Sequence, residues 1–113
     1  MASASQRAGE GQAVDAVFAA LADPTRRRLV ETLAAHPRSS VTALSSDLPI
    51  SRQAVSKHLN RLGRAGLVSS RRSGREARYE LDPRPLTDAV AWIGTVGAEW
   101  DDRLDRLRSL LER

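Results

Sequence analysis

The clearest separation of apolar and polar positions in this chain lies between residues 51 and 66. Wound into an α-helix at 100° per residue, this segment gathers its apolar side chains on one face, at spacings of four and then three residues. These apolar positions are Val55, Leu59 and Leu62, and the opposite face carries Gln53, Ser56, Lys57, Asn60 and Arg64. Ser51 is a natural N-cap and Gly66 a natural C-terminal stop, so the pattern predicts a helix with well-defined ends.

The segment before this helix has a pattern of its own. Residues 41–48 indicate a short helix with Thr42 as its N-cap, and Pro49 and Ile50 indicate a tight turn into the longer helix. The side chains expected to face inward from the short helix are Ala43, Leu44 and Leu48. A short helix, a turn and a longer helix, over about residues 42–65, form the helix-turn-helix pattern.

Alternating polar and apolar positions after the longer helix predict a β-hairpin over about residues 67–81. Residues 67–72 and 75–81 indicate its two strands, with Ser73 and Gly74 as the turn. In the second strand the side chains expected on the buried face are Ala77, Tyr79 and Leu81. Three arginines lie close to the turn, namely Arg71, Arg72 and Arg75. Such a hairpin is typical of a basic β-wing, which can lie along phosphates or enter a minor groove.

Two further helices are predicted at the start of the chain. Residues 13–22 carry apolar side chains at helical spacing, namely Val14, Val17, Phe18 and Leu21. Asp23 as N-cap and Pro24 as first helical residue begin the next helix, which runs to about His36. It is expected to bury Leu29, Val30 and Leu33. Its first turn holds three arginines where the helix dipole disfavours cations, so we expect a compensating partner, either a phosphate or a nearby acid. The arginines are Arg26, Arg27 and Arg28, and the acids are Asp23 and Glu31.

The last segment repeats its apolar side chains every seven residues. One series is Leu86, Ile93, Trp100 and Leu107, and the intervening positions carry Val90, Gly97, Leu104 and Leu111. This stripe predicts a helix over about residues 85–112, on the order of 40 Å long. A chain of this size does not need so long a stripe for its own core. We therefore expect it to form a homodimer interface, joined by Val14 and Phe18 of the first helix. The alternative is a monomer in which the long helix folds back on the rest of the chain.

The length of 113 residues bounds the domain organisation. We expect a single domain with its own small core over residues 13–113, and a disordered tail over residues 1–12, which are rich in Ala, Ser, Gly and Gln. The expected fold class is mainly α with a small β-hairpin wing, with the N- and C-terminal helices forming the dimer interface.

The net charge of +4 is unevenly distributed along the chain. Residues 51–84 carry an excess of six positive charges, whereas residues 1–50 are neutral and residues 85–113 are net −2. A basic patch confined to the helix and the wing is typical of a polyanion binder. Cations beside short amide and hydroxyl groups suit phosphates and base edges, so the flanks favour a DNA-binding helix over an ordinary solvated surface helix. The residues predicted to contact DNA are Arg52, Gln53, Ser56, Lys57, His58, Asn60, Arg64, Arg71, Arg72 and Arg75.

Three runs of residues occur in a specific combination: FAALADPTRRRL from Phe18, SRQAVSKHL from Ser51, and AGLV from Ala65. Together they resemble the ArsR-type winged helix-turn-helix transcriptional regulators, and the resemblance covers the chain from about Val14 onward. It implies a small homodimeric repressor that binds an inverted-repeat operator in double-stranded DNA, often in its own promoter.

Many ArsR-type regulators sense metals, but this chain departs from their usual ligand positions. One sensor type carries Cys-x-Cys on the first helix of the helix-turn-helix, where residues 41–48 here contain neither Cys nor His. A second type uses Asp and His on the C-terminal helix, which here has acids but no His. His36 and His58 lie in different elements, and we interpret His58 as structural or phosphate-contacting. We expect no metal and no cofactor, and the sequence assigns no small-molecule effector.

Several other functions are disfavoured by the residues present. There is no Cys nucleophile, no glycine-rich phosphate loop and no Ser/His/Asp set, so we expect no enzymatic activity. The tryptophans Trp92 and Trp100 are more often dimer core than pocket lining on such a stripe. No apolar run or signal-peptide pattern indicates a membrane or an exported protein, so we expect a cytoplasmic protein associated with the bacterial nucleoid through DNA. Two alternatives remain, a non-specific architectural DNA binder and a protein-interaction module.

Overall fold

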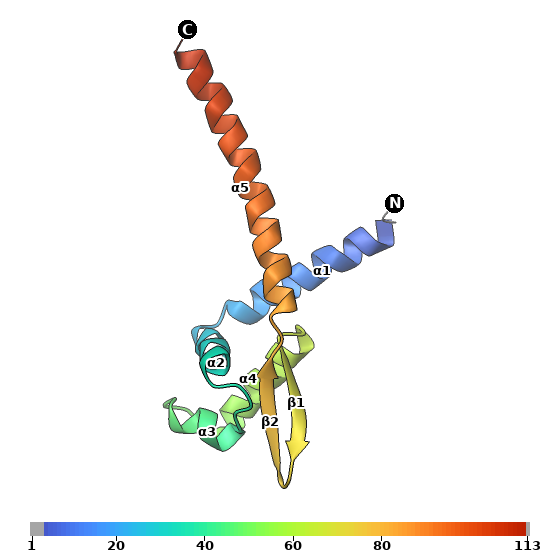
Figure 1. Ribbon diagram of the computed structural model, residues 1–113, viewed down its shortest axis with the longest axis vertical. Helices are drawn as coiled ribbons and strands as arrows, with labels where there is room; N and C mark the ends of the chain where they lie inside the picture. The colour runs from blue at the N-terminus through green and yellow to red at the C-terminus, as the bar shows by residue number, and fades with distance from the viewer. Residues whose placement is uncertain (1–3, 113) are drawn as a thin grey trace.

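The structure of the protein, a computed structural model, describes the helices and strands of residues 4–112 and the side chains of residues 11–112. This part of the chain forms five helices and one two-stranded antiparallel hairpin (Figure 1). The elements are α1 (Ala4–Leu21), α2 (Pro24–Ala35), α3 (Val41–Ser46), α4 (Arg52–Arg64), β1 (Val68–Ser73), β2 (Glu76–Leu81) and α5 (Arg84–Leu111). The predicted fold class, mainly helical with a small β-hairpin, is confirmed.

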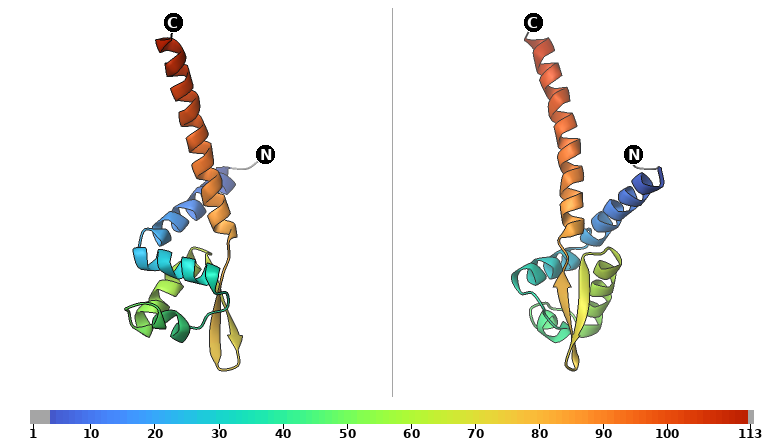
Figure 2. Two further views of the ribbon diagram at one scale, coloured as in Figure 1. Left: turned by 60° about the vertical axis from the view of Figure 1, so that its left-hand side comes forward. Right: turned by 45° about the vertical axis from the view of Figure 1, so that its right-hand side comes forward.

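The C-terminal half of α1, helices α2 to α4 and the base of the hairpin enclose one apolar core. Its largest fully buried side chains are Val17, Leu29, Leu33, Leu44, Val55, Leu59, Leu62 and Leu67. The apolar faces predicted for α2 and α4 are therefore confirmed. No polar or charged residue is buried within residues 11–112. The two views of Figure 2 show α2, α3 and α4 grouped beside the hairpin, with α5 leading away from them.

Side-chain caps define the starts of α2 and α4 as the sequence predicted. Asp23 Oδ2 accepts a hydrogen bond from the backbone N–H of Arg26 at 3.0 Å, and Pro24 follows as the first helical residue. Ser51 Oγ accepts from the backbone N–H of Ala54 at 3.1 Å. Each bond satisfies one of the amides that a helix start leaves without a partner.

The start of α3 differs from the prediction. Ser40, and not Thr42, is the N-cap, because Ser40 Oγ accepts from the backbone N–H of Ala43 at 3.1 Å. The helix therefore begins earlier, and Ala43 is turned to solvent, so its predicted inward orientation was wrong. Leu44 and Leu48 are buried as expected.

The end of α4 is a glycine-terminated turn. Gly66 adopts a φ of +77°, in the left-handed region that favours glycine. The backbone N–H of Leu67 donates to the carbonyl of Leu62, and that of Gly66 to Gly63, both at 3.0 Å. This pair of bonds is a Schellman motif. It ends α4 at the predicted position and directs the chain into β1.

The hairpin has its turn one residue later than predicted, at residues 74–75. Ser73 pairs with Glu76, which leaves Gly74 and Arg75 as a two-residue loop, and the φ of +64° at Gly74 requires glycine in its first position. The side chains predicted to face inward from β2, Ala77, Tyr79 and Leu81, are half-buried.

A bridge that the sequence did not predict ties the hairpin to the loop before α3. The backbone N–H of Tyr79 donates to the carbonyl of Ser39 at 2.9 Å. This bond joins β2 to a segment 40 residues earlier and helps to fix the hairpin against the core.

Helix α5 leaves the core soon after it begins. Ala89 is buried and Leu86 is half-buried, but every residue from Gly97 to Glu112 is exposed. The helix packs chiefly against α1, where the rings of Phe18 and Trp92 meet edge-on with centroids 5.5 Å apart. Its C-terminal end and the hairpin tip lie at opposite ends of the molecule's 68 Å long axis (Figure 1).

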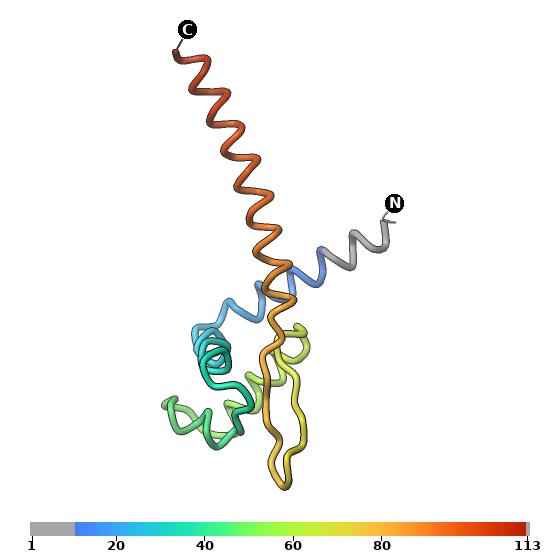
Figure 3. Tube along the Cα trace, viewed as in Figure 1, coloured from blue at the N-terminus to red at the C-terminus, as the bar shows by residue number. Residues whose placement is uncertain are grey.

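The first helix starts earlier than the residue-13 start that its apolar spacing predicted, at Ala4. The disordered tail predicted over residues 1–12 falls mainly on residues 1–10, which lie outside the described side chains and are grey in Figure 3. That expectation stays a prediction. Within the described part of the chain, none of the helices combines the length and apolarity needed to cross a bilayer.

Candidate nucleic-acid interface

Helix α4 presents a polar, acid-free face to solvent. Its exposed side chains are Arg52, Gln53, Lys57, Asn60, Arg61 and Arg64, while Ser56 and His58 are half-buried at the edges of this face. Within the described residues, no lysine or arginine of α4 forms an ion pair with an acid. The cations of this face are therefore available to an outside anion. Arg61 was absent from the predicted contacts, although its position on the helix places it beside Lys57 and Arg64.

His58 faces the start of α2. Its Nδ1 lies 3.9 Å from Asp23 Oδ2 and 3.5 Å from Arg26 Nη1. The backbone N–H of Arg26, followed by the nearby charges of His58 and Arg26, holds the pKa of Asp23 below its usual value. These contacts favour the structural interpretation of His58 over the phosphate-contacting one.

The arginines at the start of α2 have partners other than those expected. Arg26 donates from Nε to the carbonyl of Ala20 at 2.6 Å and from Nη2 to that of Ala19 at 3.2 Å. Arg27 donates from Nη1 to the carbonyl of Leu21 at 2.7 Å. These carbonyls end α1, where a helix favours cations. The prediction of an acid partner was wrong for these two side chains. Their positive charges are stabilised instead by the carbonyl groups at the C-terminus of α1.

The three arginines of the wing are exposed, but their positions on the hairpin differ. In the strand register Arg71 pairs with Arg78, and Arg72 pairs with Ala77. Because neighbouring residues of a strand point to opposite faces, the side chains of Arg71 and Arg72 leave β1 in opposite directions, although both residues line one open cavity. Arg75 occupies the turn itself. The wing therefore offers cations in more than one direction.

Arg38 is a site residue that sequence reasoning missed. It adopts a φ of +64°, a region that non-glycine residues rarely occupy. Its Nε donates to Glu80 Oε1 at 2.8 Å, and its carbonyl accepts from Arg78 Nη1 at 3.1 Å. Together with Arg71, Arg72 and Arg78 it lines an open cavity of about 380 Å³ at the wing. No local pattern signals this role, because Arg38 and Glu80 are 42 residues apart.

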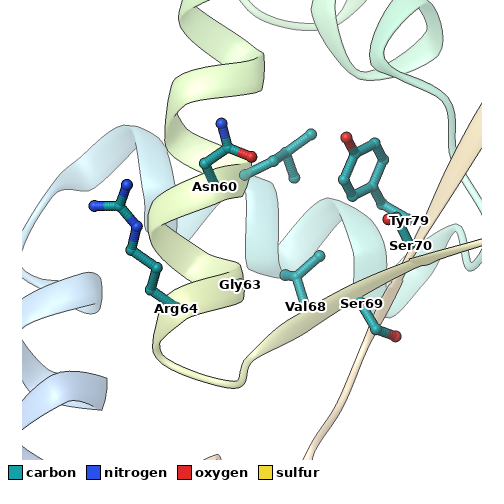
Figure 4. Close-up of a pocket in the computed structure, with 8 residues that line it drawn as sticks. Asn60, Gly63, Arg64, Val68, Ser69, Ser70 and Tyr79 are labelled. Carbon is teal, nitrogen blue, oxygen red and sulfur yellow. The ribbon is translucent and has the colours of Figure 1, made fainter.

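A second open cavity, of about 420 Å³, lies between α4 and the hairpin (Figure 4). Its lining residues are Leu59, Asn60, Gly63 and Arg64 of α4, with Val68, Ser69, Ser70 and Tyr79 of the hairpin. In Figure 4 Asn60 and Arg64 come from the helix, and Arg64 extends away from the hairpin. The hydroxyl-bearing side chains of this cavity were not among the predicted contacts.

The predicted dimer residues form a continuous stripe on α5 and its meeting point with α1. Val14 and Leu86 are half-buried, and Phe18 is 37% exposed. The members of the stripe that are exposed are Val90, Ile93, Gly97, Trp100, Leu104 and Leu107. So many large apolar side chains on one exposed helix face are typical of a surface that binds a partner.

Metal-ligating residues are dispersed in the described part of the chain. No group of three or more His, Cys, Asp or Glu side chains lies close enough there to hold a metal ion. His36 is the C-cap of α2 and His58 lies on α4, as the sequence indicated.

Comparisons with known proteins agree with this arrangement. Residues 21–71 match a family described as a helix-turn-helix domain. The chain is 50% identical over 72 residues to the HTH-type transcriptional regulator Rv2034 of Mycobacterium tuberculosis, a match that covers 64% of this chain and 66% of that relative.

Solved structures extend the likeness to nearly the whole chain. An ArsR-like transcriptional regulator from Rhodococcus sp. RHA1 is 39% identical with a TM-score of 0.79, and the match covers 90% of this chain and 95% of that one. A match in fold alone, at 24% identity and a TM-score of 0.67, is a homodimeric winged helix-turn-helix DNA-binding domain from Mycobacterium bovis, with 88% and 91% covered. The chain belongs to the ArsR family of winged helix-turn-helix transcriptional regulators.

Proposed function

We propose that the protein is a homodimeric repressor that binds an inverted-repeat operator, with α4 of each protomer in a major groove. The observation that carries this proposal is the exposed face of α4, which has cations and amides, the half-buried hydroxyl of Ser56 at its edge, and no acid. As a member of a family of transcriptional regulators the protein is not an enzyme. Its work as a DNA-binding regulator implies a cytoplasmic location, in contact with the nucleoid.

The side chains of α4 divide into base-reading and phosphate-binding groups. Gln53, Ser56 and Lys57, in the first half of α4, are the proposed base-reading residues, because amide and hydroxyl groups can discriminate base edges in the major groove. Arg52, Asn60 and Arg64 hold phosphates. The wing arginines Arg71, Arg72 and Arg75 bind the backbone or a minor groove, on more than one face of the hairpin. His58 supports α4 from within through Asp23 and Arg26.

The dimer forms through α5 and the adjoining part of α1. The exposed stripe on α5 has no cover within the described chain, and Trp100 and Ile93 are each more than half exposed. Gly94 and Gly97 support a helix-to-helix contact, because each costs up to about 1 kcal/mol in a helix and an added Cβ would meet nothing within 4 Å at either position. Within the described residues nothing packs closely against these glycines, whereas a second α5 at close approach would need them.

The dimer supplies the spacing of the two recognition helices. Two half-sites related by a two-fold axis lie about 34 Å apart, one turn of DNA. A change in how the α5 helices pack would alter this spacing and release the operator. Binding upstream of its own gene would make the protein autoregulated. The residues at the usual ligand positions do not support metal sensing.

Fluorescence anisotropy on two duplexes tests the proposal. One duplex comes from upstream of the protein's own gene and the other has a random sequence, and both are titrated over a range of salt. We expect tight binding with a strong preference for the upstream duplex. About six to eight phosphate contacts per dimer give a slope of log K against log salt of about −5 to −7. Equal binding to both duplexes would favour an architectural DNA binder, and salt-insensitive or absent binding would favour a protein-interaction module.

A further inference from the structure

The flank of α4 that faces the start of α2 carries a basic cluster that the predicted contacts account for only in part. We call it the α2-side cluster, and its members are Arg26, Lys57, His58, Arg61 and Arg64. With Asn60 they line an open cavity of about 410 Å³. Arg26 comes from α2 and the other members come from α4.

The guanidinium of Arg26 is held in place before any ligand arrives. Two of its nitrogens donate to the carbonyls of Ala20 and Ala19 at the end of α1, and Nη1 lies 3.5 Å from His58 Nδ1. Because an arginine has five N–H donors, these contacts leave donors free for an anion. A side chain that is already fixed loses little rotamer entropy on binding, so this is a preorganised site.

Acids in the described part of the chain balance the charge of the cluster only in part. The acid beside it is Asp23, whose Oδ2 lies 3.9 Å from His58 Nδ1 and accepts a hydrogen bond from the backbone N–H of Arg26. Within the described residues, Lys57, Arg61 and Arg64 have no ion-pair partner. Like charges held together repel one another, so a bound anion stabilises this arrangement.

The width of the DNA major groove indicates that the anion is a backbone phosphate. The major groove is about 12 Å wide and an α-helix with its side chains is about 10–12 Å across, so the two phosphate backbones run along both flanks of an inserted helix. One flank of α4 faces the hairpin, across the cavity of Figure 4. Asn60 and Arg64 line both this cavity and that of the α2-side cluster. His58 and Arg61 line only the cavity that includes Arg26 of α2, so these two residues mark the other flank.

We propose that the α2-side cluster binds the DNA backbone on the edge of the major groove opposite the wing, with Arg26 and Arg61 as its phosphate-contacting residues. This inference rests on the proposed function and adds a second backbone clamp to it. The wing and the α2-side cluster then bind the phosphates of opposite DNA strands, and α4 lies between these two strands. Arg26 also contacts the end of α1, so the clamp is joined to a helix of the dimer interface.

Arg61→Gln is the direct test, since Arg61 is exposed and glutamine is a good helix former. Its matched control is Arg28→Gln, which removes the same charge from an exposed position of α2 outside the cluster. We expect Arg61→Gln to weaken binding to both the upstream and the random duplex, by about fivefold per lost contact and about twenty-fivefold per dimer at 0.15 M salt. The salt slope should shrink by about 2 per dimer, with no change in melting temperature.

A second variant tests the placement on the opposite strand. Arg72→Gln removes a wing contact, and the double variant Arg61→Gln with Arg72→Gln should show the sum of the two free-energy losses, because the two side chains contact different strands. A double variant no weaker than either single variant would contradict two separate clamps.

Binding of inorganic pyrophosphate tests whether the anion bound by the α2-side cluster belongs to DNA or to a free phosphate-bearing ligand. At constant ionic strength we expect pyrophosphate to bind the wild type and Arg61→Gln equally weakly. Micromolar pyrophosphate binding that Arg61→Gln abolishes, with DNA binding unchanged, would overturn the assignment to DNA. Arg61→Gln that behaves like Arg28→Gln on DNA would overturn the clamp and leave the proposed function intact. A wild type that binds neither duplex would overturn both.

Discussion

The helix-turn-helix body and helix α5 both carry apolar stripes at helical spacing, but the stripe of the body is buried and that of α5 is exposed. In the body, Val55, Leu59 and Leu62 of α4 are at most 1% exposed. On α5, Trp92, Ile93 and Trp100 are 52–56% exposed. A periodic stripe therefore predicts that a face will be buried, but not what will bury it. The body supplies its own cover, whereas α5 extends beyond every element that could cover it (Figure 1).

This contrast assigns separate tasks to the two regions. The body holds α4 and the wing in a fixed relation through one core, a Schellman turn and the bridge between Ser39 and Tyr79. In the proposed dimer, the exposed surface of α5 is buried against a second copy and sets how the two bodies are spaced. Variants in the body should therefore change stability or DNA binding, and variants on the outer part of α5 should change assembly.

The largest expected effect is in the core of the body. Leu59→Ala removes a side chain that is 1% exposed and leaves a cavity, so the free energy of unfolding should fall by about 2–5 kcal/mol in urea titrations. Asn60→Ala, its exposed neighbour, should change stability by no more than about 0.5 kcal/mol. Equal losses for the two variants would contradict the assignment of α4's buried face.

The next effect separates assembly from folding. Leu104→Asn puts an amide into the exposed stripe of α5, and burying it without a partner should weaken self-association by about a hundredfold. Sedimentation velocity over a dilution series measures this, while circular dichroism should show unchanged helix content. Asp102→Asn, on the opposite side of α5, is the control. A Leu104→Asn protein that stays dimeric at the same dilutions as the wild type would place the interface elsewhere.

Within the body, base reading and backbone binding should separate. Gln53→Ala should cost about 1–3 kcal/mol on the upstream duplex and little on the random one, because an amide reads bases. Arg72→Ala should weaken both duplexes alike and lower the salt slope. Anisotropy titrations of the two variants measure these differences. Equal effects of both variants on both duplexes would contradict the division of labour.

The smallest effect concerns acid stability at the start of α2. The backbone N–H of Arg26, with the charges of His58 and Arg26, lowers the pKa of Asp23 in the folded protein, so its ionised form stabilises the fold above its ordinary pKa of 3.8. That stabilisation is lost as the pH falls through the lower, folded-state pKa. Asp23→Asn keeps an N-cap but does not titrate. Between pH 5 and pH 3 the melting temperature should fall more for the wild type than for this variant, and parallel curves would contradict this linkage.

Local patterns predicted the elements and much of the interface. The two faces of α4, its cap at Ser51 and its stop at Gly66 all follow from spacing and residue type within 16 residues. The N-cap of α3 was misassigned because Ser40 and Thr42 are both good capping residues, and sequence alone did not distinguish them.

Contacts between segments that are far apart in the chain could not be predicted from local sequence patterns. Arg38 meets Glu80 across 42 residues, and Arg26 meets His58 across 32. The expected acid partner of Arg26 was wrong because the competing acceptors, the carbonyls that end α1, are backbone atoms and carry no residue signature. The predicted DNA and dimer contacts stay predictions until a bound state is measured.

Selection of the tightest-binding duplexes from a random-sequence pool, followed by hydroxyl-radical footprinting, tests the central claim most directly. A dimer that reads DNA with two α4 helices should enrich an inverted repeat and protect two half-sites centred about 34 Å apart, or a whole number of further turns. A pool with no enriched sequence, or a single half-site with one protected patch, would contradict a dimeric, sequence-specific repressor.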